Sequence, residues 1–404
     1  MTLPSPSLAA AAGPATPPAA APLTPRLLFL LAAGAGFSVA SIYYAQPMLG
    51  TLAEQFKASS AAIGLVPTLT QLGYAAGTLL LAPLSDRFDR KTIITGKALA
   101  LIVALLLAAA APTLSLLYLA SALIGLAASV AQDLVPAAAI LAPAERRGKA
   151  VGTAMTGLLL GILLSRVISG LVAQQFGWRA MFLAAALSIV ALTLLLRRGL
   201  PRFAPTTSLP LHTLLGSLLT LLRQHGSLRR AALSQGLLSV AFSAFWSTLA
   251  LMLHQPPLSL GSAAAGAFGL AGAAGALAAP LAGGLADRRG PELVTRLGAG
   301  LVLLSFVAMS FGPPNLWVIA LAALVLDLGY QATLVSHQSI IYGIDPAARS
   351  RLNAVLIGAM FIGMSAGSWL GGLAMGQGGW HGVTALASVA AAAALAVRLS
   401  GGRK

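Results

Sequence analysis

Long apolar runs alternate with short polar segments along nearly the whole chain from about residue 26 onward. Each run holds roughly 20 residues, the length that an α-helix needs to cross a bilayer. The runs are unbroken and rich in Leu, Ala and Gly, whereas the strands of a membrane barrel would alternate with a period of two. The pattern predicts an all-α membrane protein with twelve transmembrane helices, at about 26–48, 61–82, 92–111, 114–141, 149–173, 178–196, 231–253, 262–285, 292–312, 315–342, 350–374 and 379–398.

Composition agrees with this prediction. Of 404 residues, 58% are hydrophobic and only 8% are charged, against about a quarter in ordinary soluble domains. The net charge of +16 does not indicate a nucleic-acid partner, because the basic residues are scattered between the apolar runs. The chain has no cysteine, which excludes disulfides and thiolate metal sites.

The basic residues also predict orientation. If the N-terminus is cytoplasmic, all but three of the 25 Lys and Arg residues fall in cytoplasmic segments. Lys57 and Arg179 lie in opposite loops, and Arg166 lies within a span. Because positive residues are retained in cytoplasmic loops, we expect both termini to be cytoplasmic.

The longest polar stretch, 197–230, divides the chain into six helices plus six. It contains the apolar patch "LHTLLGSLLTLL", which predicts a cytoplasmic linker with one amphipathic helix at the membrane surface. The first residues are rich in Pro, Ala and Thr and uncharged, which is typical of a disordered tail. The predicted organisation is therefore a tail, a bundle, a linker, a second bundle and a short tail, at 1–25, 26–196, 197–230, 231–399 and 400–404.

The two halves repeat one another. "LSDRFDRK" (84–91) follows the second predicted helix, and "LADRRG" (285–290) follows the eighth. A shift of half the chain places Gly161 on Gly363 and Gly177 on Gly379. Parallel six-helix repeats joined by a basic loop are typical of a transporter that rocks about a central site.

At these motifs the chain resembles the major facilitator superfamily, and the resemblance covers nearly everything from about residue 26. The family's signature between helices two and three reads G-x-L-a-D-r-x-G-r-[kr]; Ala82 and Asp89 replace its glycines. The positions that match in the first and second copies are Leu84, Asp86, Arg87, Arg90, Lys91, Gly283, Leu285, Asp287, Arg288 and Gly290. The resemblance implies the major facilitator fold.

The same motifs imply a cytoplasmic gate at Asp86, Arg87, Arg90, Asp287 and Arg288. An Asp at the cytoplasmic end of helix two can accept hydrogen bonds from the N-terminus of a helix in the other half and from a nearby Arg. Such contacts would bias the equilibrium between inward-facing and outward-facing states. The alternative is that the basic residues of these motifs only enforce topology.

Within the superfamily, "YYAQPMLGTLAEQF" (43–56) and the stretch from Ala131 to Leu171 resemble the bacterial branch that exports drugs, nucleosides and sugars by proton antiport. Gly157 and Gly161 match the branch's helix-five signature, G-x-x-x-G-P-x-x-G-G. Four positions depart from the branch's pattern: Ser121, Ile162, Ser165 and Arg166. The resemblance implies an exporter of small organic solutes in the bacterial inner membrane. Proton-coupled uptake and a membrane sensor on the same fold remain alternatives.

Three charges are predicted to lie at membrane depth, namely Asp133, Arg166 and Asp327. A charge at membrane depth costs at least about 2.5–3.5 kcal/mol, so each is a functional candidate. Arg166 and Asp327 lie near the same depth, and Asp133 lies about 8 residues, or roughly 12 Å, nearer the cytoplasm. We therefore expect Arg166 and Asp327 to face each other across a central cavity. The alternative is that each is satisfied separately by carbonyl groups or water.

Polar and aromatic side chains on helices one, two and ten complete the predicted substrate and proton pathway: Tyr44, Gln46, Gln71, Tyr74, Tyr330, Gln331 and Gln338. On helix ten, Asp327, Gln331 and Gln338 share one helical stripe, which should face protein or water rather than lipid. On helix one, Tyr43 is predicted to be an interfacial anchor in the aromatic belt, and Pro47 to kink or end the helix.

No enzymatic or nucleotide-driven machinery is evident. The five His and nine acidic residues are dispersed and form neither a nucleophile–base set nor a metal cluster. No G-x-x-x-x-G-K-[ST] loop is present. We therefore expect a transporter that needs no cofactor and uses the proton gradient. Its expected partners are a small-molecule solute, protons and lipid, with no nucleic acid, and we expect it to act as a monomer.

Overall fold

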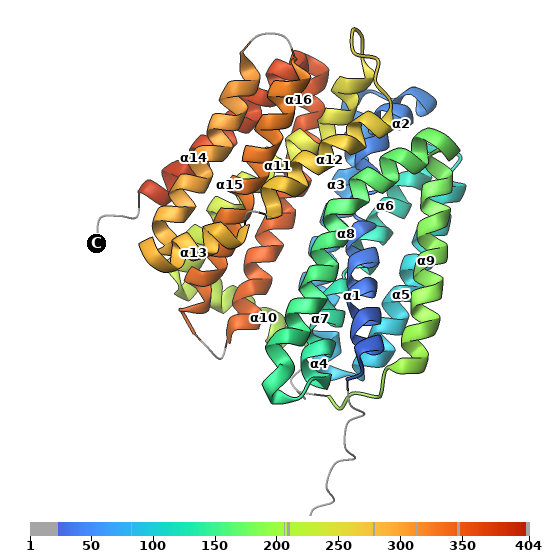
Figure 1. The fold of residues 1–404 in the computed structure, drawn as a ribbon, viewed down its shortest axis with the longest axis vertical. Coiled ribbons are helices and arrows are strands. Elements are labelled where there is room, and N and C mark those ends of the chain that lie inside the picture. The colour runs from blue at the N-terminus through green and yellow to red at the C-terminus, as the bar shows by residue number, and fades with distance from the viewer. Residues whose placement is uncertain are drawn as a thin grey trace, which may run out of the picture.

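The computed structural model describes residues 23–81, 83–205, 207, 211–277, 279–311, 314–345 and 348–400. Figure 1 shows two groups of helices side by side, the N-terminal half from blue to green and the C-terminal half from yellow to red. The N-terminal half contains α1 (Pro25–Ala40), α2 (Leu49–Phe56), α3 (Ser60–Ala76), α4 (Leu84–Arg87), α5 (Arg90–Ala110), α6 (Leu114–Ala128), α7 (Ala131–Leu141), α8 (Arg147–Phe176) and α9 (Trp178–Gly199). After the linker helix α10 (Leu211–Gln224), the C-terminal half contains α11 (Gly226–His254), α12 (Ser262–Leu277), α13 (Ala279–Arg289), α14 (Pro291–Ser310), α15 (Leu316–Tyr342) and α16 (Arg349–Leu399).

Nine helical stretches of the described residues are long and apolar enough to cross a membrane, and α1 and α12 are shorter apolar helices. The predicted spans fall on these elements in order. The eleventh and twelfth spans are joined in α16, which bends at Gly379, where φ is +56°. A positive φ is readily adopted only by glycine, so this residue allows the chain to reverse without a loop. The predicted all-α membrane fold is confirmed.

Helix one differs from its prediction. It ends at Ala40, and turns and a short 3₁₀ helix, η1 (Gln46–Met48), lead into α2. Pro47 lies inside η1, as expected of a residue that lacks an N–H and ends a helix. The side chains of residues 41–48 therefore do not follow the helical wheel of α1.

The polar stretch between the halves is also shorter than predicted. Its amphipathic helix is present as α10, but α11 already begins at Gly226, and Arg197 and Arg198 belong to the last turn of α9. Residues 1–22 and 401–404, which hold most of the predicted tails, lie outside the described residues.

Small residues allow the helices to approach closely, as is usual between transmembrane helices. Between α1 and α8, a Cβ added at Gly161 would lie 2.2 Å from the carbonyl oxygen of Gly36. Between α3 and α6, a Cβ at Gly125 would lie 1.9 Å from the carbonyl oxygen of Thr70. These contacts fix the bundle that positions the charged residues.

The two halves also pack on each other through small residues. The Arg- and Lys-rich turns before α5 and before α8 lie on one side of the protein, which we call the basic side. On the other side, Ser262 of α12 donates a hydrogen bond to the carbonyl of Gly170 on α8 (3.0 Å). Gly372 of α16 lies so close to α3 that an added Cβ would be 2.7 Å from the carbonyl oxygen of Ser60. The halves are thus closed together on the side opposite the basic one.

Candidate functional site

Arg166 lies buried in the middle of α8, surrounded by aromatic rings from both halves. Its Cζ is 4.2 Å from the centroid of Trp246, 5.0 Å from that of Tyr43 and 6.0 Å from that of Phe242. Its Nε donates a hydrogen bond to Oε1 of Gln46 (3.0 Å). The guanidinium is therefore stabilised by cation–π contacts and one charge-assisted hydrogen bond.

Asp327 of α15 is also buried, beside the same tryptophan. The indole N–H of Trp246 lies next to the carboxyl group, but neither Trp246 Nε1 nor Asp327 Oδ2 completes a hydrogen bond with a described residue. Both groups crowd Gly272 of α12, where an added Cβ would be 2.7 Å from Trp246 Cζ2 and 2.9 Å from Asp327 Oδ2. A buried carboxylate oxygen without a partner is unfavourable unless a proton or a ligand satisfies it.

The predicted pairing of Arg166 with Asp327 is realised only in part. Both side chains lie beside the indole ring of Trp246, so they do come close together at the contact between the halves. However, no salt bridge joins them in the part of the chain that the structure describes. Gln46 takes the Nε hydrogen bond and the ring of Trp246 lies against the guanidinium, while Nη2 of Arg166 is buried without a partner among the described residues.

Asp133 does not join this pair. It is buried at the start of α7, where its Oδ2 accepts a hydrogen bond from Nζ of Lys97 (2.7 Å) and its Oδ1 accepts one from Oγ of Ser85 (2.6 Å). Lys97 lies two turns into α5, and its side chain is only 7% exposed. The prediction of three charges within the spans was therefore incomplete, because Lys97 is a fourth and pairs with Asp133 inside the N-terminal half.

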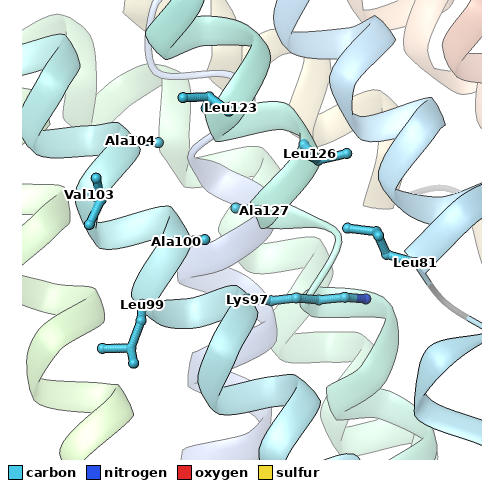
Figure 2. A pocket seen from close by; sticks show the side chains of 9 residues that line it. All are labelled: Leu81, Lys97, Leu99, Ala100, Val103, Ala104, Leu123, Leu126 and Ala127. Atoms are coloured by element: carbon cyan, nitrogen blue, oxygen red, sulfur yellow. The ribbon is translucent and has the colours of Figure 1, made fainter.

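Lys97 reaches Asp133 along the wall of an apolar cavity of about 360 Å³ between α5 and α6. Figure 2 shows its side chain extended below Leu126 and Ala127, with the nitrogen toward Leu81 and away from Leu99. The aliphatic stem is thus packed on apolar side chains while the ammonium is neutralised by the carboxylate.

The predicted helix-ten stripe separates into different environments. The hydroxyl of Tyr330 shares a hydrogen bond with Ser239 of α11 (2.8 Å), and its ring stacks on Phe242 at 4.3 Å. Gln338 donates to Oδ1 of Asn353 on α16 (3.1 Å), whereas Gln331 is partly exposed. Of the predicted helix-ten residues, Asp327 and the flanking Tyr330 lie at the aromatic cluster around Arg166, whereas Gln331 and Gln338 do not.

Gln71 and Tyr74 of α3 both connect the two halves. Gln71 exchanges hydrogen bonds with Ser243 of α11 (3.0 Å) and accepts one from Ser368 of α16 (3.0 Å). The ring of Tyr74 packs on Phe361 of α16 at 4.4 Å, while its hydroxyl accepts a hydrogen bond from Gln132. We interpret both as contacts of the interface between the halves.

The two tyrosines that follow α1 are placed differently from the prediction. Tyr43 is not an interfacial anchor in contact with lipid, because it is 4% exposed and lies against Arg166. Gln46, as predicted for the pathway, reaches the same arginine. Tyr44 lines a largely apolar cavity of about 480 Å³ between α1 and α8.

The predicted gate residues lie at the basic side. Asp86 forms an ion pair with Arg90 (2.9 Å). Both line a cavity of about 180 Å³ that also contacts Ser350 and Arg351, in the first turn of α16. Arg87 lies over its neighbouring Phe88 ring, and Asp287 and Arg288 are exposed near the end of α13. The structure thus places Asp86 opposite the N-terminus of a helix in the other half; its role in gating stays a prediction.

The second copy of the family signature, "LADRRG" (285–290), keeps its last glycine for a geometric reason. Gly290 joins α13 to α14 with φ +87°, which favours glycine. At the corresponding position of the first copy, Asp89 has φ −56°, and its carboxylate accepts hydrogen bonds from the backbone N–H groups of Lys91 and Phe203. Asp89 therefore caps α5 instead of forming a left-handed turn.

Comparison with known proteins agrees with this architecture. The chain is 42% identical over 361 residues to the transporter YgaY of Escherichia coli, covering 89% of this chain and 92% of that protein. It is 30% identical over 260 residues to the multidrug resistance protein MdtG of Citrobacter koseri, covering 61% and 62% of the two chains. The crystal structure of a bacterial Spinster homologue in an inward-facing, occupied conformation matches with a TM-score of 0.79 at 15% identity, covering 94% and 96%.

The family model of the Major Facilitator Superfamily matches residues 28–341 and 231–401. These matches span both six-helix halves, and the relatives named above are transporters. The chain is therefore a membrane transport protein, not an enzyme, and it belongs to the Major Facilitator Superfamily.

Proposed function

We propose that this transporter exports small amphipathic organic solutes in exchange for protons, by alternating access across the bacterial inner membrane. The observation that carries the proposal is the buried Asp327 carboxyl group, which has an oxygen without a described partner next to Arg166 and Trp246. A carboxyl group at membrane depth between two moving halves can bind a proton in one state and release it in the other.

Protonation changes the balance of charges at this centre. With Asp327 ionised, the field of its carboxylate stabilises the Arg166 cation, which is otherwise held only by rings and Gln46. With Asp327 protonated, its Oδ2, which has no described partner, is taken by the proton and can no longer accept a hydrogen bond or a positive charge from a solute. Solute and proton therefore compete for the same pair, which is the condition for exchange.

Aromatic surfaces suit a solute with a flat apolar part. Trp246, Phe242 and Tyr43 surround Arg166, and Tyr330 stacks on Phe242. Few charges are present, which favours a neutral or singly charged solute over a polyanion. The name of the relative MdtG, a multidrug resistance protein, supports export of drug-like compounds; nucleosides and sugars are the other solutes to test.

The basic side is assigned to the cytoplasm because cytoplasmic loops retain Lys and Arg. The close contacts between Ser262 and Gly170, and between Gly372 and Ser60, then lie on the periplasmic side. We infer that the conformation is one in which the periplasmic entrance is shut.

Reconstituted vesicles with an imposed pH gradient test the proposal. A one-unit gradient supplies about 1.4 kcal/mol per proton, which supports about tenfold accumulation of a neutral solute exchanged for one proton. With an acidic lumen, protons leave and antiport drives solute inward, whichever way the protein is inserted. We expect about tenfold accumulation of the transported members of a panel of aromatic drugs, nucleosides and sugars.

The sign of the gradient separates the alternatives. Accumulation in vesicles with an alkaline lumen would instead show uptake by symport. If the flux of every transported solute is independent of the pH gradient, proton coupling is refuted. Protein-free vesicles report the leak of each solute.

We infer that a polar contact between His254 and Glu54 contributes to the periplasmic closure. Nε2 of His254, at the end of α11, lies 3.0 Å from Oε2 of Glu54 on α2; the His254 side chain is partly exposed and that of Glu54 is exposed. Exposed pairs contribute about 0–1 kcal/mol, so Glu54→Gln should increase the outward-open population up to about fivefold.

A cysteine at position 249 measures this population. Leu249 is buried beside Arg166, and the chain has no native cysteine, so a larger outward-open population in Leu249→Cys appears as faster labelling by an impermeant maleimide. Lys57→Gln, which removes an exposed charge three residues after Glu54, should leave the labelling rate unchanged. An unaltered labelling rate in Glu54→Gln would mean that the pair does not stabilise closure.

A further inference from the structure

A second polar cavity lies far from the charged centre, at the basic ends of α5 and α9. Its volume is about 440 Å³. The lining side chains combine cations and hydroxyl groups with an apolar wall: Asp89, Lys91, Thr92, Thr95, Gly96, Leu99, Arg197 and Arg202. None of these residues belongs to the proposed substrate and proton pathway.

The cavity carries an excess of positive charge. Lys91, Arg197 and Arg202 contribute three cations from three different segments, against the single acid Asp89. The Asp89 carboxylate already accepts hydrogen bonds from two backbone N–H groups and the hydroxyl of Thr92. Within the described parts of the chain, no hydrogen bond or ion pair engages the guanidinium of Arg197 or Arg202. Two exposed cations therefore remain free to bind an anion.

Lys91 is held in a fixed position at this site. Its Nζ donates a hydrogen bond to the carbonyl oxygen of Leu200 (2.6 Å), in the turn after α9. This bond leaves two of the three ammonium protons for another acceptor. The anion site therefore has one ordered donor and two mobile ones.

The floor of the cavity is apolar and continues into the membrane face. Around Gly96, an added Cβ would meet no atom within 4 Å, so space is present one and a half turns into α5. Along the same helical face, Leu99, Val103 and Leu106 are 49%, 56% and 43% exposed. The site thus combines a polar end that can bind an anion with an apolar surface suited to an acyl chain.

We propose that this cavity binds the phosphate headgroup of an anionic phospholipid from the leaflet on the basic side, with an acyl chain lying along Leu99 and Val103. Clusters of basic residues between transmembrane helices at a membrane surface are suited to such headgroups. A soluble phosphate ester would satisfy Lys91, Arg197 and Arg202 equally well, but it would gain nothing from the apolar face. The combination of charge and exposed apolar wall favours the lipid.

Native mass spectrometry of the purified chain, titrated with phosphatidylglycerol or phosphatidylcholine, tests the site. We expect preferential binding of phosphatidylglycerol. Each basic residue near a membrane surface contributes about fivefold in affinity, so Arg197→Gln with Arg202→Gln should weaken phosphatidylglycerol about 30-fold. A matched double variant, Arg146→Gln with Arg147→Gln, removes two exposed arginines at the start of α8 and should change binding less than twofold.

A second variant tests the cavity without changing charge. Gly96→Leu places a side chain in the open space and is compatible with the helix, because leucine is a better helix former than glycine. It should weaken phosphatidylglycerol at least about tenfold with an unchanged unfolding temperature. Equal weakening by the α8 control would show non-specific attraction, and full competition by glycerol 3-phosphate would show a soluble-anion site; either result overturns the proposal. Because binding is measured without transport, its outcome does not depend on proton coupling.

Discussion

Asp327→Asn is expected to abolish accumulation driven by a pH gradient, reducing it from about tenfold per pH unit to the equilibrium ratio of one. The amide has nearly the shape of the carboxylic acid but cannot exchange a proton. Asp327 crowds Gly272 and lies beside Trp246, so this conservative change preserves the packing. Accumulation is measured in vesicles with an acidic lumen.

Exchange of labelled for unlabelled solute provides the second measurement for this variant. It requires alternating access but no net proton movement, so Asp327→Asn should retain it. Glu145→Gln, which neutralises an exposed acid in the turn before α8, serves as the matched control and should accumulate solute normally. Undiminished gradient-driven accumulation in Asp327→Asn would remove Asp327 as the proton carrier, whereas loss of both activities would indicate a structural role.

The charged centre could be predicted from the sequence because a charge at membrane depth costs free energy and is therefore a candidate for a functional residue. Arg166 and Asp327 were located by this reasoning alone, and both are buried at the contact between the halves. Their direct pairing was not realised, because it depends on the rotation of α8 and α15 and on the ring of Trp246. No periodicity in one sequence reports such a rotation.

An error in one helix boundary can reverse the predicted direction of a side chain, as Tyr43 shows. The predicted helix extends to residue 48, which places Tyr43 in the aromatic belt at the membrane interface. Because α1 ends at Ala40 and turns follow, Tyr43 instead points at Arg166. Pro47 was the available signal, since a proline within a predicted span marks a break as readily as a kink.

Lys97 was overlooked for a different reason. It lies seven residues after Arg90, close enough to the basic turn to be counted with the charges that set topology. A lysine at this depth can also extend its stem to the membrane surface. Its ammonium is buried because it pairs with Asp133, 36 residues away on another helix. A pair formed by two such distant helices leaves no local pattern in the sequence.

Removing one partner of this buried pair is expected to destabilise the fold strongly. Lys97→Met should lower the free energy of unfolding by about 3–5 kcal/mol, because it leaves the Asp133 carboxylate buried with only the Ser85 hydroxyl as a partner. Methionine retains most of the length and flexibility of the lysine stem, so packing against Leu126 and Ala127 is preserved. The change is measured by denaturant unfolding of the purified protein in detergent.

The double variant decides whether charge or packing is responsible. Lys97→Met combined with Asp133→Leu removes both charges and should recover most of the lost stability, because a buried ion pair can often be replaced by apolar side chains with little net loss. Lys149→Met, on an exposed lysine in the first turn of α8, controls for the loss of positive charge and should lie within about 0.5 kcal/mol of the unchanged protein. If Lys97→Met alone were equally mild, the ammonium would not be compensating a buried carboxylate. Additive losses in the double variant would place the effect in packing. A recovered double variant that still transports solute would show, in addition, that the pair supports the N-terminal half and takes no part in proton exchange at Asp327.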